Sequence, residues 1–376
     1  MSSIPIIEVH LPEKRRYETF LQGVINYSRQ HEKWLIRHLP GGIDIQPRFA
    51  GCDGLIANAA SLEKVPLSAI TKPCVTYGYS QRSIPNVCFE ERYIGERAAE
   101  IFVERGFSRF AFLSCAWPEA CLRQEGFIRQ LNELGHQVIL LPAEASNNEP
   151  YRARIMELAK RLEPLQKPIA ILAPDDHSAE HILDACVLAG INVPDEISVI
   201  GVDDNPFVSM AATPSLSSLD NNMLKLGLES ARLLHAQLQG HKPQSEVVRS
   251  CIFHSRESTD TIASDDRVMT DLLTYIRSNG AENVDVTSLV NRSGISRRML
   301  EYRFRKAFGI SPKRFLEERR FQRACQLLEN TDDCLNVIAE ASGFGEAAAL
   351  CRIIKRRTGL TPVKYRVNRA EIRSVN

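Results

Sequence analysis

The chain has 376 residues, a net charge of +1 and a hydrophobic fraction of 44%, which is enough for two or three folded domains. No stretch approaches the roughly 20 apolar residues that cross a bilayer, and residues 1–12 lack the pattern of a signal peptide, so we expect a cytoplasmic protein with no membrane partner. The ten cysteines form no Cys-x-x-Cys pair and no zinc-spaced cluster. We therefore expect reduced thiols, no metal and no cofactor.

The charge is unevenly distributed along the chain. Residues 265–376 hold 21 Lys and Arg against 14 Asp and Glu, a net charge of +7, whereas residues 1–264 hold 26 against 32, a net charge of −6. A basic C-terminal part on an acidic body indicates a polyanionic partner for that part alone. A basic helical surface exposed to solvent gives the same charge, so charge by itself leaves both interpretations open.

Residues 1–260 alternate short apolar runs with helical patterns. The runs lack period-2 alternation, as expected of strands buried on both faces; they are Ile4–Val9, Gly54–Ala59, Pro73–Tyr77, Arg109–Cys115, Gln137–Leu141, Ile169–Ala173 and Ile197–Val202. The helical patterns are Ile94–Gly106, Leu122–Gly135, Tyr151–Leu162 and Ser178–Ala189. This alternation predicts parallel sheets covered by helices on both faces, and the length favours two lobes with a cleft.

From residue 261 onward the strand patterns stop. Residues 261–267 read as a polar linker, and residues 268–376 read as a second, all-helical domain. Its predicted helices are Val268–Ser278, Val286–Ser293, Ser296–Phe308, Pro312–Glu329, Leu335–Ser342 and Glu346–Thr358.

Two helix-turn-helix patterns lie in this segment. In the first, Leu300, Phe304 and Phe308 recur at helical spacing and face the core, so the opposite face of Ser296–Phe308 points outward. Placed in a major groove, Arg298 suits guanine edges and Glu301 suits a cytosine amino group. The other outward residues suit phosphates or the groove surface; they are Arg297, Tyr302, Arg305 and Lys306.

The second pattern has Leu350 and Ile354 on its buried face. The basic residues near its end are predicted to contact DNA; they are Arg352, Lys355, Arg356 and Arg357. Its start carries Ala347 and Ala348, which can touch a thymine methyl but cannot hydrogen-bond a base. We therefore expect the second unit to contribute phosphate contacts and shape reading more than base recognition.

The spacing across this segment resembles the AraC/XylS family of DNA-binding domains. The matching residues are Gly309-Ile310-Ser311-Pro312, Arg320, Arg323-Ala324, Leu327-Leu328, Ile338-Ala339, Gly343-Phe344, Lys355-Arg356, Gly359-Leu360-Thr361-Pro362 and Tyr365-Arg366. The resemblance implies two helices that enter successive major grooves on one face of double-stranded promoter or operator DNA.

The first 260 residues resemble the effector domains of the LacI/GalR family, which have the two-lobed periplasmic-binding-protein-like (type I) fold. The matching residues are Gly95, Ala98-Ala99, Gly106, Arg109–Phe112, Arg123, Gly126-Phe127, Pro174-Asp175-Asp176, Ala179, Gly190, Pro194, Ile197–Asp204 and Pro214–Ser218. The combination of both domains in one chain resembles the XylR-like regulators, in which a sugar-sensing domain is fused to an AraC-type module.

This resemblance implies a small sugar or polyol in the cleft between the lobes. Carried over by position, Arg123 would donate to hydroxyls, and Asp176 and Asp203 stand at the carboxyl ends of predicted strands. Asp175 stands where relatives often have Asn, and Glu90 where they often have Asp. For each acid the alternative is a helix N-cap, which we favour for Asp175 and Asp204.

Four further residues keep two interpretations each. Arg16 and Tyr17 in the first βα turn either reach the ligand or cover surface, and surface is the reading we favour. Trp117 either stacks on a sugar face or fills a lobe interface. His177 is a helix-start residue rather than a catalytic base.

No nucleophile elbow, phosphate loop or dinucleotide fingerprint occurs, so no enzyme activity is expected. The prediction is a homodimeric, sugar-controlled transcriptional regulator, most simply an activator, that works on the bacterial nucleoid. Two alternatives remain: a DNA-binding regulator whose front domain only dimerises, and a sugar-binding protein without a regulatory role.

Overall fold

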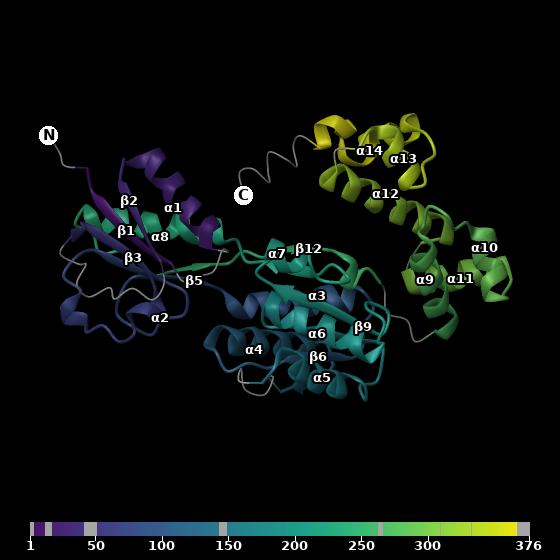
Figure 1. The fold of residues 1–376 in the computed structure, drawn as a ribbon, viewed down its shortest axis with the longest axis horizontal. Helices are drawn as coiled ribbons and strands as arrows, with labels where there is room; N and C mark the ends of the chain where they lie inside the picture. The colour runs from purple at the N-terminus through teal and green to yellow at the C-terminus, as the bar shows by residue number, and fades with distance from the viewer. Residues whose placement is uncertain are drawn as a thin grey trace. The chain divides into compact units, whose positions relative to one another are not determined.

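A computed structural model describes residues 4–11, 17–40, 51–142, 149–261, 266–308, 310–331 and 333–366. The chain divides into two compact units. The first comprises residues 1–104 and 108–260, and the second comprises residues 105–107 and 261–376. Figure 1 shows strands in the first unit and helices alone beyond it.

The first unit contains two six-stranded sheets, each forming one lobe. The first sheet has the order β11-β5-β4-β3-β1-β2, and its neighbouring strands are all parallel. Its strands are β1 (Ile6–Leu11), β2 (Leu35–Pro40), β3 (Gly54–Asn58), β4 (Cys74–Tyr77), β5 (Asn86–Phe89) and β11 (Glu246–Val248).

The second sheet has the order β12-β10-β9-β8-β6-β7, with only β12 antiparallel to its neighbour among the strands described. Its strands are β6 (Phe110–Leu113), β7 (Val138–Leu141), β8 (Ile169–Leu172), β9 (Ile197–Val202), β10 (Ser217–Asp220) and β12 (Ile252–His254). The central strands β6, β8 and β9 are buried along their whole length. For these three strands the predicted burial on both faces is confirmed. For the run Gln137–Leu141 it is wrong, because this run forms the edge strand β7, which exposes Ile139 and Leu140.

Helices cover both sheets in pairs. In the first lobe α1 (Tyr17–His31) packs against α8 (Met223–Leu238), and in the second α3 (Glu91–Glu104) packs against α4 (Pro118–Glu133). The remaining helices of this unit are α2 (Ala59–Leu62), α5 (Tyr151–Leu162), α6 (Asp176–Ala189) and α7 (Pro206–Ser209). Each lobe has its own apolar core, one around Phe20 and Tyr77 and the other around Ile171 and Leu183.

The helix pair α3–α4 is held close by two glycines. A Cβ atom at Gly95 would collide with the carbonyl oxygen of Arg123, and one at Gly126 would collide with that of Arg92. The two backbones can therefore touch only where both residues lack a side chain. This contact places the first turn of α3, which holds Glu91, beside the second turn of α4, which holds Arg123.

The chain passes between the lobes where strands end. It leaves the first sheet after β5, returns to α8 after β10, and leaves again between β11 and β12. The sequence correctly predicts the long apolar strands. It misses β2, β5, β10, β11 and β12, which do not form continuous apolar runs and whose place in a sheet depends on their neighbours.

The second unit is helical throughout the residues described. Its helices are α9 (Arg267–Asn279), α10 (Val286–Ser293), α11 (Arg297–Phe308), α12 (Pro312–Asn330), α13 (Leu335–Ala341) and α14 (Ala347–Thr358). Residues 262–265, most of the predicted linker, lie outside the described residues. No helix among those described combines the length and the apolar character needed to span a bilayer.

Two apolar cores divide this second unit. One contains Leu300 and Phe304 of α11, and the other contains Leu350 and Ile354 of α14. Each turn between the paired helices has residues with positive φ, at Gly294 in the first and at Gly343 and Gly345 in the second. These conformations favour glycine, so the glycine positions fix the two turns that the sequence predicts.

Candidate ligand and DNA-binding sites

A cavity of about 220 Å³ lies in the first unit, where residues of both lobes meet. The described residues that line it are Tyr17, Asn58, Tyr77, Gly78, Phe89, Glu91, Trp117, Glu119, Arg123, Asp175, Asp203, Asn221, Met223 and Leu226. Aromatic surfaces and convergent polar groups are the usual walls of a small-molecule site. The size suits a small ligand rather than a drug-sized one, for which cavities of roughly 300–1,000 Å³ are typical.

Arg123 is the central cation of this cavity. Its side chain is buried, its Nε donates to Glu91 Oε2 at 2.6 Å, and its Nη1 donates to the carbonyl oxygen of Pro174 at 2.5 Å. Asp203 Oδ1 lies 3.9 Å from Arg123 Nη2. A guanidinium held in this way is fixed in orientation before any ligand arrives.

Glu91 is the acid that faces Arg123 from α3. Burial raises the pKa of this carboxyl, and the adjacent Arg123 opposes that rise through its charge and its hydrogen bond. Because burial is the larger effect, the pKa lies above its ordinary value. Removal of either partner would leave the other buried without its counter-charge and would destabilise the fold.

Asp203 reaches the cavity from the turn that follows β9. Its Oδ1 accepts a hydrogen bond from Asn221 Nδ2 at 2.9 Å, so residues at the end of β9 and after β10 are joined. Asn221 lies at the second passage of the chain between the lobes and is buried. The two strand ends thus place a carboxylate and an amide beside Arg123.

Aromatic rings form the apolar part of the wall. Tyr17 and Tyr77 lie with ring centroids 5.9 Å apart, and both are buried. Trp117 lines the cavity while 39% of its surface remains exposed, and Phe89 lies at the end of β5. Rings beside fixed hydrogen-bond donors and acceptors suit the flat apolar face and polar edge of a sugar.

Three of the five predicted ligand residues line this cavity, namely Arg123, Asp175 and Asp203. Asp175 is also the predicted N-cap, since its side chain accepts from the backbone N–H of Ser178 at 2.8 Å. Tyr17 lines the cavity as well, whereas Arg16 lies outside the described residues.

The structure does not bring Asp176 or Glu90 to the cavity lining. Asp176 is buried and turned toward Ser218, whose hydroxyl donates to Asp176 Oδ1 at 2.5 Å. Glu90 lies between β5 and α3, where the chain first crosses from one lobe to the other. Its neighbour Glu91 lines the cavity instead. The one-residue difference arises because α3 begins at Glu91, so its first turn sets which acid faces inward.

Residues missed by the sequence reasoning come from positions that long-range packing creates. Asn58 is the last residue of β3, Glu119 lies in the first turn of α4, and Asn221 follows β10. Asn58 and Asn221 end parallel strands of two different sheets, so the carboxyl-end rule would have found them had β10 been predicted. His177 is exposed, with Glu180 3.8 Å away, in keeping with a helix-start residue.

The predicted DNA-reading residues of the first helix-turn-helix lie on one face of α11. Leu300 and Phe304 are buried while Arg298, Tyr302, Arg305 and Lys306 are exposed. Arg297 is also exposed, and its Nε lies 3.4 Å from Glu301 Oε1 one turn away. An exposed pair of this kind is weak, so both side chains can turn to DNA at little cost.

In the second helix-turn-helix, α14 presents a different surface from that of α11. Ala348 at its start is exposed and Ala347 is half-buried, whereas Arg352, Lys355 and Arg356 are exposed further along. Arg357 is instead drawn inward, where it donates to Glu318 at 2.5 Å and lies over the ring of Phe321.

Comparison with known proteins gives the context of both sites. A periplasmic binding protein-like domain family matches residues 99–259, and a helix-turn-helix domain family matches residues 289–368. The xylose operon regulatory protein of Haemophilus influenzae is 26% identical over 331 residues, which cover 84% of this chain and 85% of that protein. The xylose operon regulatory protein of Escherichia coli is 27% identical, covering 72% of this chain and 70% of its own. Over most of its length the chain is similar to XylR-like transcriptional regulators.

The fold agrees with this family. The solved structure of the xylose-binding transcription activator XylR superimposes with a TM-score of 0.74 at 23% identity, covering 97% of this chain and 98% of that one. A XylR-like regulator thus joins a periplasmic-binding-protein-like effector domain to an AraC-type DNA-binding domain. The relatives named here are transcriptional regulators rather than enzymes, as the sequence predicts.

Proposed function

We propose that the chain controls transcription in response to a small sugar or polyol bound in the cavity around Arg123. The observation that carries this proposal is the buried group of Arg123, Glu91 and Asp203 beside aromatic rings in a cavity of about 220 Å³. A sugar hydroxyl both donates and accepts, so it can bridge a guanidinium and a carboxylate that stand side by side.

The relatives support the chemical class of the ligand. Two are named for a xylose operon, and one solved neighbour is named as xylose-binding. D-Xylose is therefore the first ligand to test. Pentoses, hexoses and uronic acids should then be compared by thermal shift, where a ligand at 100 times its Kd adds about 2.7 kcal/mol to the stability.

Asp203→Ala tests the assignment of the cavity. We expect this variant to lose the thermal shift with sugar while its affinity for operator DNA without sugar stays unchanged. Glu104→Ala, which removes an exposed carboxylate at the end of α3, is the matched control and should keep the shift. If no sugar shifts the wild-type chain, the front unit serves another role, such as dimerisation alone.

We propose that α11 and α14 contact double-stranded promoter or operator DNA unequally. The exposed Arg298 and Tyr302 and the half-buried Glu301 give α11 side chains that can reach base edges. The start of α14 offers Ala347 and Ala348, and its basic residues Arg352, Lys355 and Arg356 suit phosphates. The first helix-turn-helix would then specify the DNA sequence, and the second would position the protein on the DNA.

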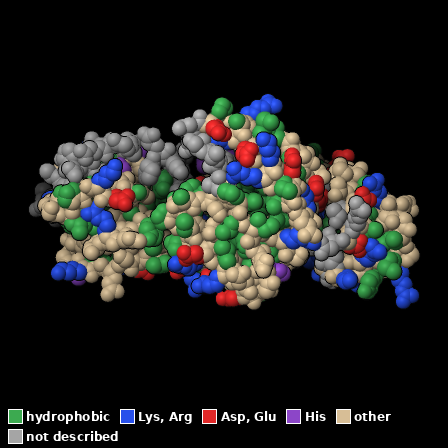
Figure 2. Space-filling model, turned by 90° about the horizontal axis from the view of Figure 1, so that it is seen from below, with side chains coloured by type: hydrophobic (Ala, Val, Ile, Leu, Met, Phe, Trp, Pro, Cys, Tyr) green, Lys and Arg blue, Asp and Glu red, His purple; other side chains and the backbone are tan. Residues whose placement is uncertain are grey.

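We further propose that two copies of the chain act together as a cytoplasmic activator. Exposed apolar residues support a contact surface on the second lobe, where the edge strand β7 exposes Ile139 and Leu140 and α6 exposes Val187 and Leu188. Figure 2 shows hydrophobic side chains gathered near the middle of the face in view. Light scattering of Leu140→Glu against wild type would test the dimer, and a reporter promoter with and without sugar would test activation.

A further inference from the structure

The turn after β9 has an unusual backbone. Asp203 and Asp204 both have positive φ, at 103° and 47°, although neither is glycine. Non-glycine residues rarely adopt this region, and they stay there only where surrounding contacts hold them. The turn carries Asp203 into the cavity, so whatever holds the turn also sets the position of that carboxylate.

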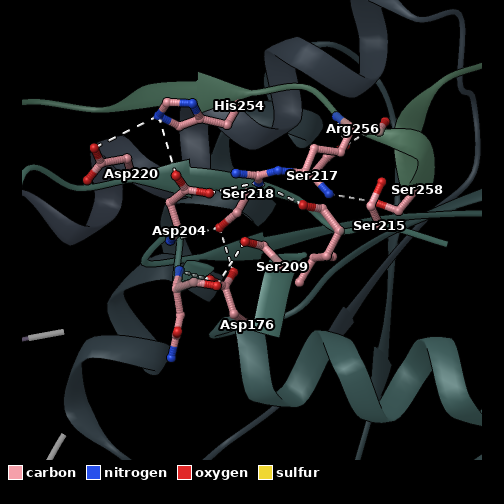
Figure 3. A network of polar contacts seen from close by, with 12 residues as sticks. Asp176, Asp204, Ser209, Ser215, Ser217, Ser218, Asp220, His254, Arg256 and Ser258 are labelled. Atoms are coloured by element: carbon pink, nitrogen blue, oxygen red, sulfur yellow. Dashed lines mark hydrogen bonds and ion pairs between the residues drawn. The ribbon is translucent and has the colours of Figure 1, made fainter. Parts of the chain in front are cut away.

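Arg256 holds the turn from the side of β12. Its Nη1 lies 2.7 Å from Asp204 Oδ1 and also donates to the carbonyl oxygen of Leu216 at 2.8 Å. The backbone N–H of Arg256 donates to Ser217 Oγ at 2.7 Å, which ties the same residue to β10. Figure 3 shows Asp204 within this network of serines, acids and basic side chains.

Further contacts hold the turn on its other sides. His254 Nε2 lies 3.6 Å from Asp204 Oδ2 and 3.9 Å from Asp220 Oδ2. The backbone N–H of Asp204 donates to Ser218 Oγ at 3.1 Å, and that of Asn205 donates to Asp176 Oδ2 at 2.6 Å. Asp176, which sequence reasoning assigned to the ligand, therefore supports the turn.

The segment that carries Arg256 is also the one that leads out of the effector unit. After Arg256 comes a short 3-10 helix, Glu257–Thr259, and the first unit ends at Asp260. Ser258 within it is buried; its hydroxyl donates to the carbonyl oxygen of Val199 on β9 at 2.7 Å. One stretch of chain thus contacts β9, the strand that leads to Asp203, and continues into the segment where the DNA-binding unit begins.

We propose that Arg256 is a positioning residue that holds Asp204, sets Asp203 in the cavity, and couples the cavity to the chain segment that starts the DNA-binding unit. The coupling part rests on the sugar-controlled function proposed above. The positioning part stands on the geometry of the turn alone.

Hydrogen exchange of the sugar-free, full-length chain tests the positioning. In Arg256→Gln we expect faster exchange in peptides covering residues 203–207. Without the ion pair to Asp204 the turn is held less firmly, so the backbone N–H groups of Asp204 and Asn205 separate more often from Ser218 Oγ and Asp176 Oδ2. Arg256→Lys should keep much of the protection. Arg232→Gln removes an exposed cation on α8 that pairs with Glu229 and Glu246, and it should leave exchange in this segment unchanged. Equal exchange in wild type and Arg256→Gln would overturn the proposal.

A second-site variant separates positioning from general damage. Asp204→Gly relieves the backbone conformation, since glycine adopts positive φ without a steric cost. We expect Arg256→Gln to weaken D-xylose binding about tenfold, as for the loss of one charge-assisted contact. Arg256→Gln combined with Asp204→Gly should regain part of that affinity. No recovery would mean that Arg256 supports the lobe in general rather than the turn.

DNA binding measures the coupling. Arg256→Gln should bind operator DNA without sugar as the wild type does, while saturating D-xylose changes its DNA affinity by a smaller factor than in wild type. An unaltered factor would refute coupling through this residue. If the wild type ignores D-xylose, the sugar proposal fails for that ligand, and the exchange measurement still decides the positioning role.

Discussion

The cavity around Arg123 and the outward face of α11 use the same residue types in opposite ways. In the cavity Arg123 and Glu91 are buried and held 2.6 Å apart by two helices that meet at glycines. On α11, Arg297 and Glu301 lie 3.4 Å apart on an exposed surface within one helix. The first pair depends on tertiary packing and low solvation, and the second depends only on helical spacing.

This difference predicts how each region responds to substitution. Removing one partner from the cavity leaves a buried charge with no solvent to stabilise it, so stability falls. Removing a side chain from α11 leaves the fold intact and alters only what it meets on DNA.

Arg123→Met should lower the free energy of unfolding by roughly 3–5 kcal/mol at neutral pH, because Glu91 and Asp203 stay buried without their cation. The folded-state pKa of Glu91 is already raised, so protonation stabilises the folded chain as pH falls. The loss should therefore shrink toward acidic pH, which urea denaturation at several pH values can measure. Arg92→Met removes an exposed partner of Glu125 at 2.7 Å and should cost less than about 1 kcal/mol. Equal losses would show that burial does not distinguish the two pairs.

Gly126→Val should destabilise the effector unit by about 2–3 kcal/mol, because its side chain would meet the backbone of Arg92 and force α3 and α4 apart. Gly51→Ala is the control, since among the described residues other than its chain neighbours no heavy atom lies within 4 Å of the added Cβ. Thermal unfolding of the two variants gives the comparison. A Gly126→Val protein as stable as the control would mean that the helices can separate freely.

Arg298→Ala should weaken specific operator binding by roughly 1–3 kcal/mol per half-site if the side chain reads a base. The protein should unfold at the same temperature as wild type, since Arg298 is exposed. Competition between operator and unrelated DNA separates the two roles. Uniform weakening on both would make Arg298 a phosphate contact.

Arg352→Ala on α14 should have the smallest effect on specificity. We expect weaker binding to all sequences and a salt dependence reduced by about one released counterion. Titrations at several salt concentrations measure that slope. A change in sequence preference would instead show that the second helix-turn-helix reads bases.

Sequence reasoning was most successful where a property is local. The period of Leu300, Phe304 and Leu350, Ile354 placed α11 and α14 and predicted which faces are buried. Continuous apolar runs located β6, β8 and β9 for the same reason, since a strand that is buried on both faces is apolar at successive positions. Asp175 was correctly predicted as a cap, because capping needs only a residue three positions away.

Prediction was weaker where partners are far apart in the chain. Asp203 and Arg123 were found through a family resemblance, but Glu91, Asn221 and Arg256 were not. Asn221 and Arg256 follow β10 and β12, whose sequences do not indicate strands, and the position of Glu91 depends on where α3 begins. Asp176 stands at a strand end as ligand residues do, yet it faces Ser218.

By itself the sequence determined that there are two domains, that the second contains a pair of helix-turn-helix units, and that α11 and α14 each have an exposed basic face. Helical spacing and strand burial are set by neighbours along the chain. Only the tertiary structure decided which acids face the cavity and which hold the turn beneath it. Two carboxylates at adjacent strand ends look alike in a sequence, and the side each one faces depends on side chains that approach from distant segments.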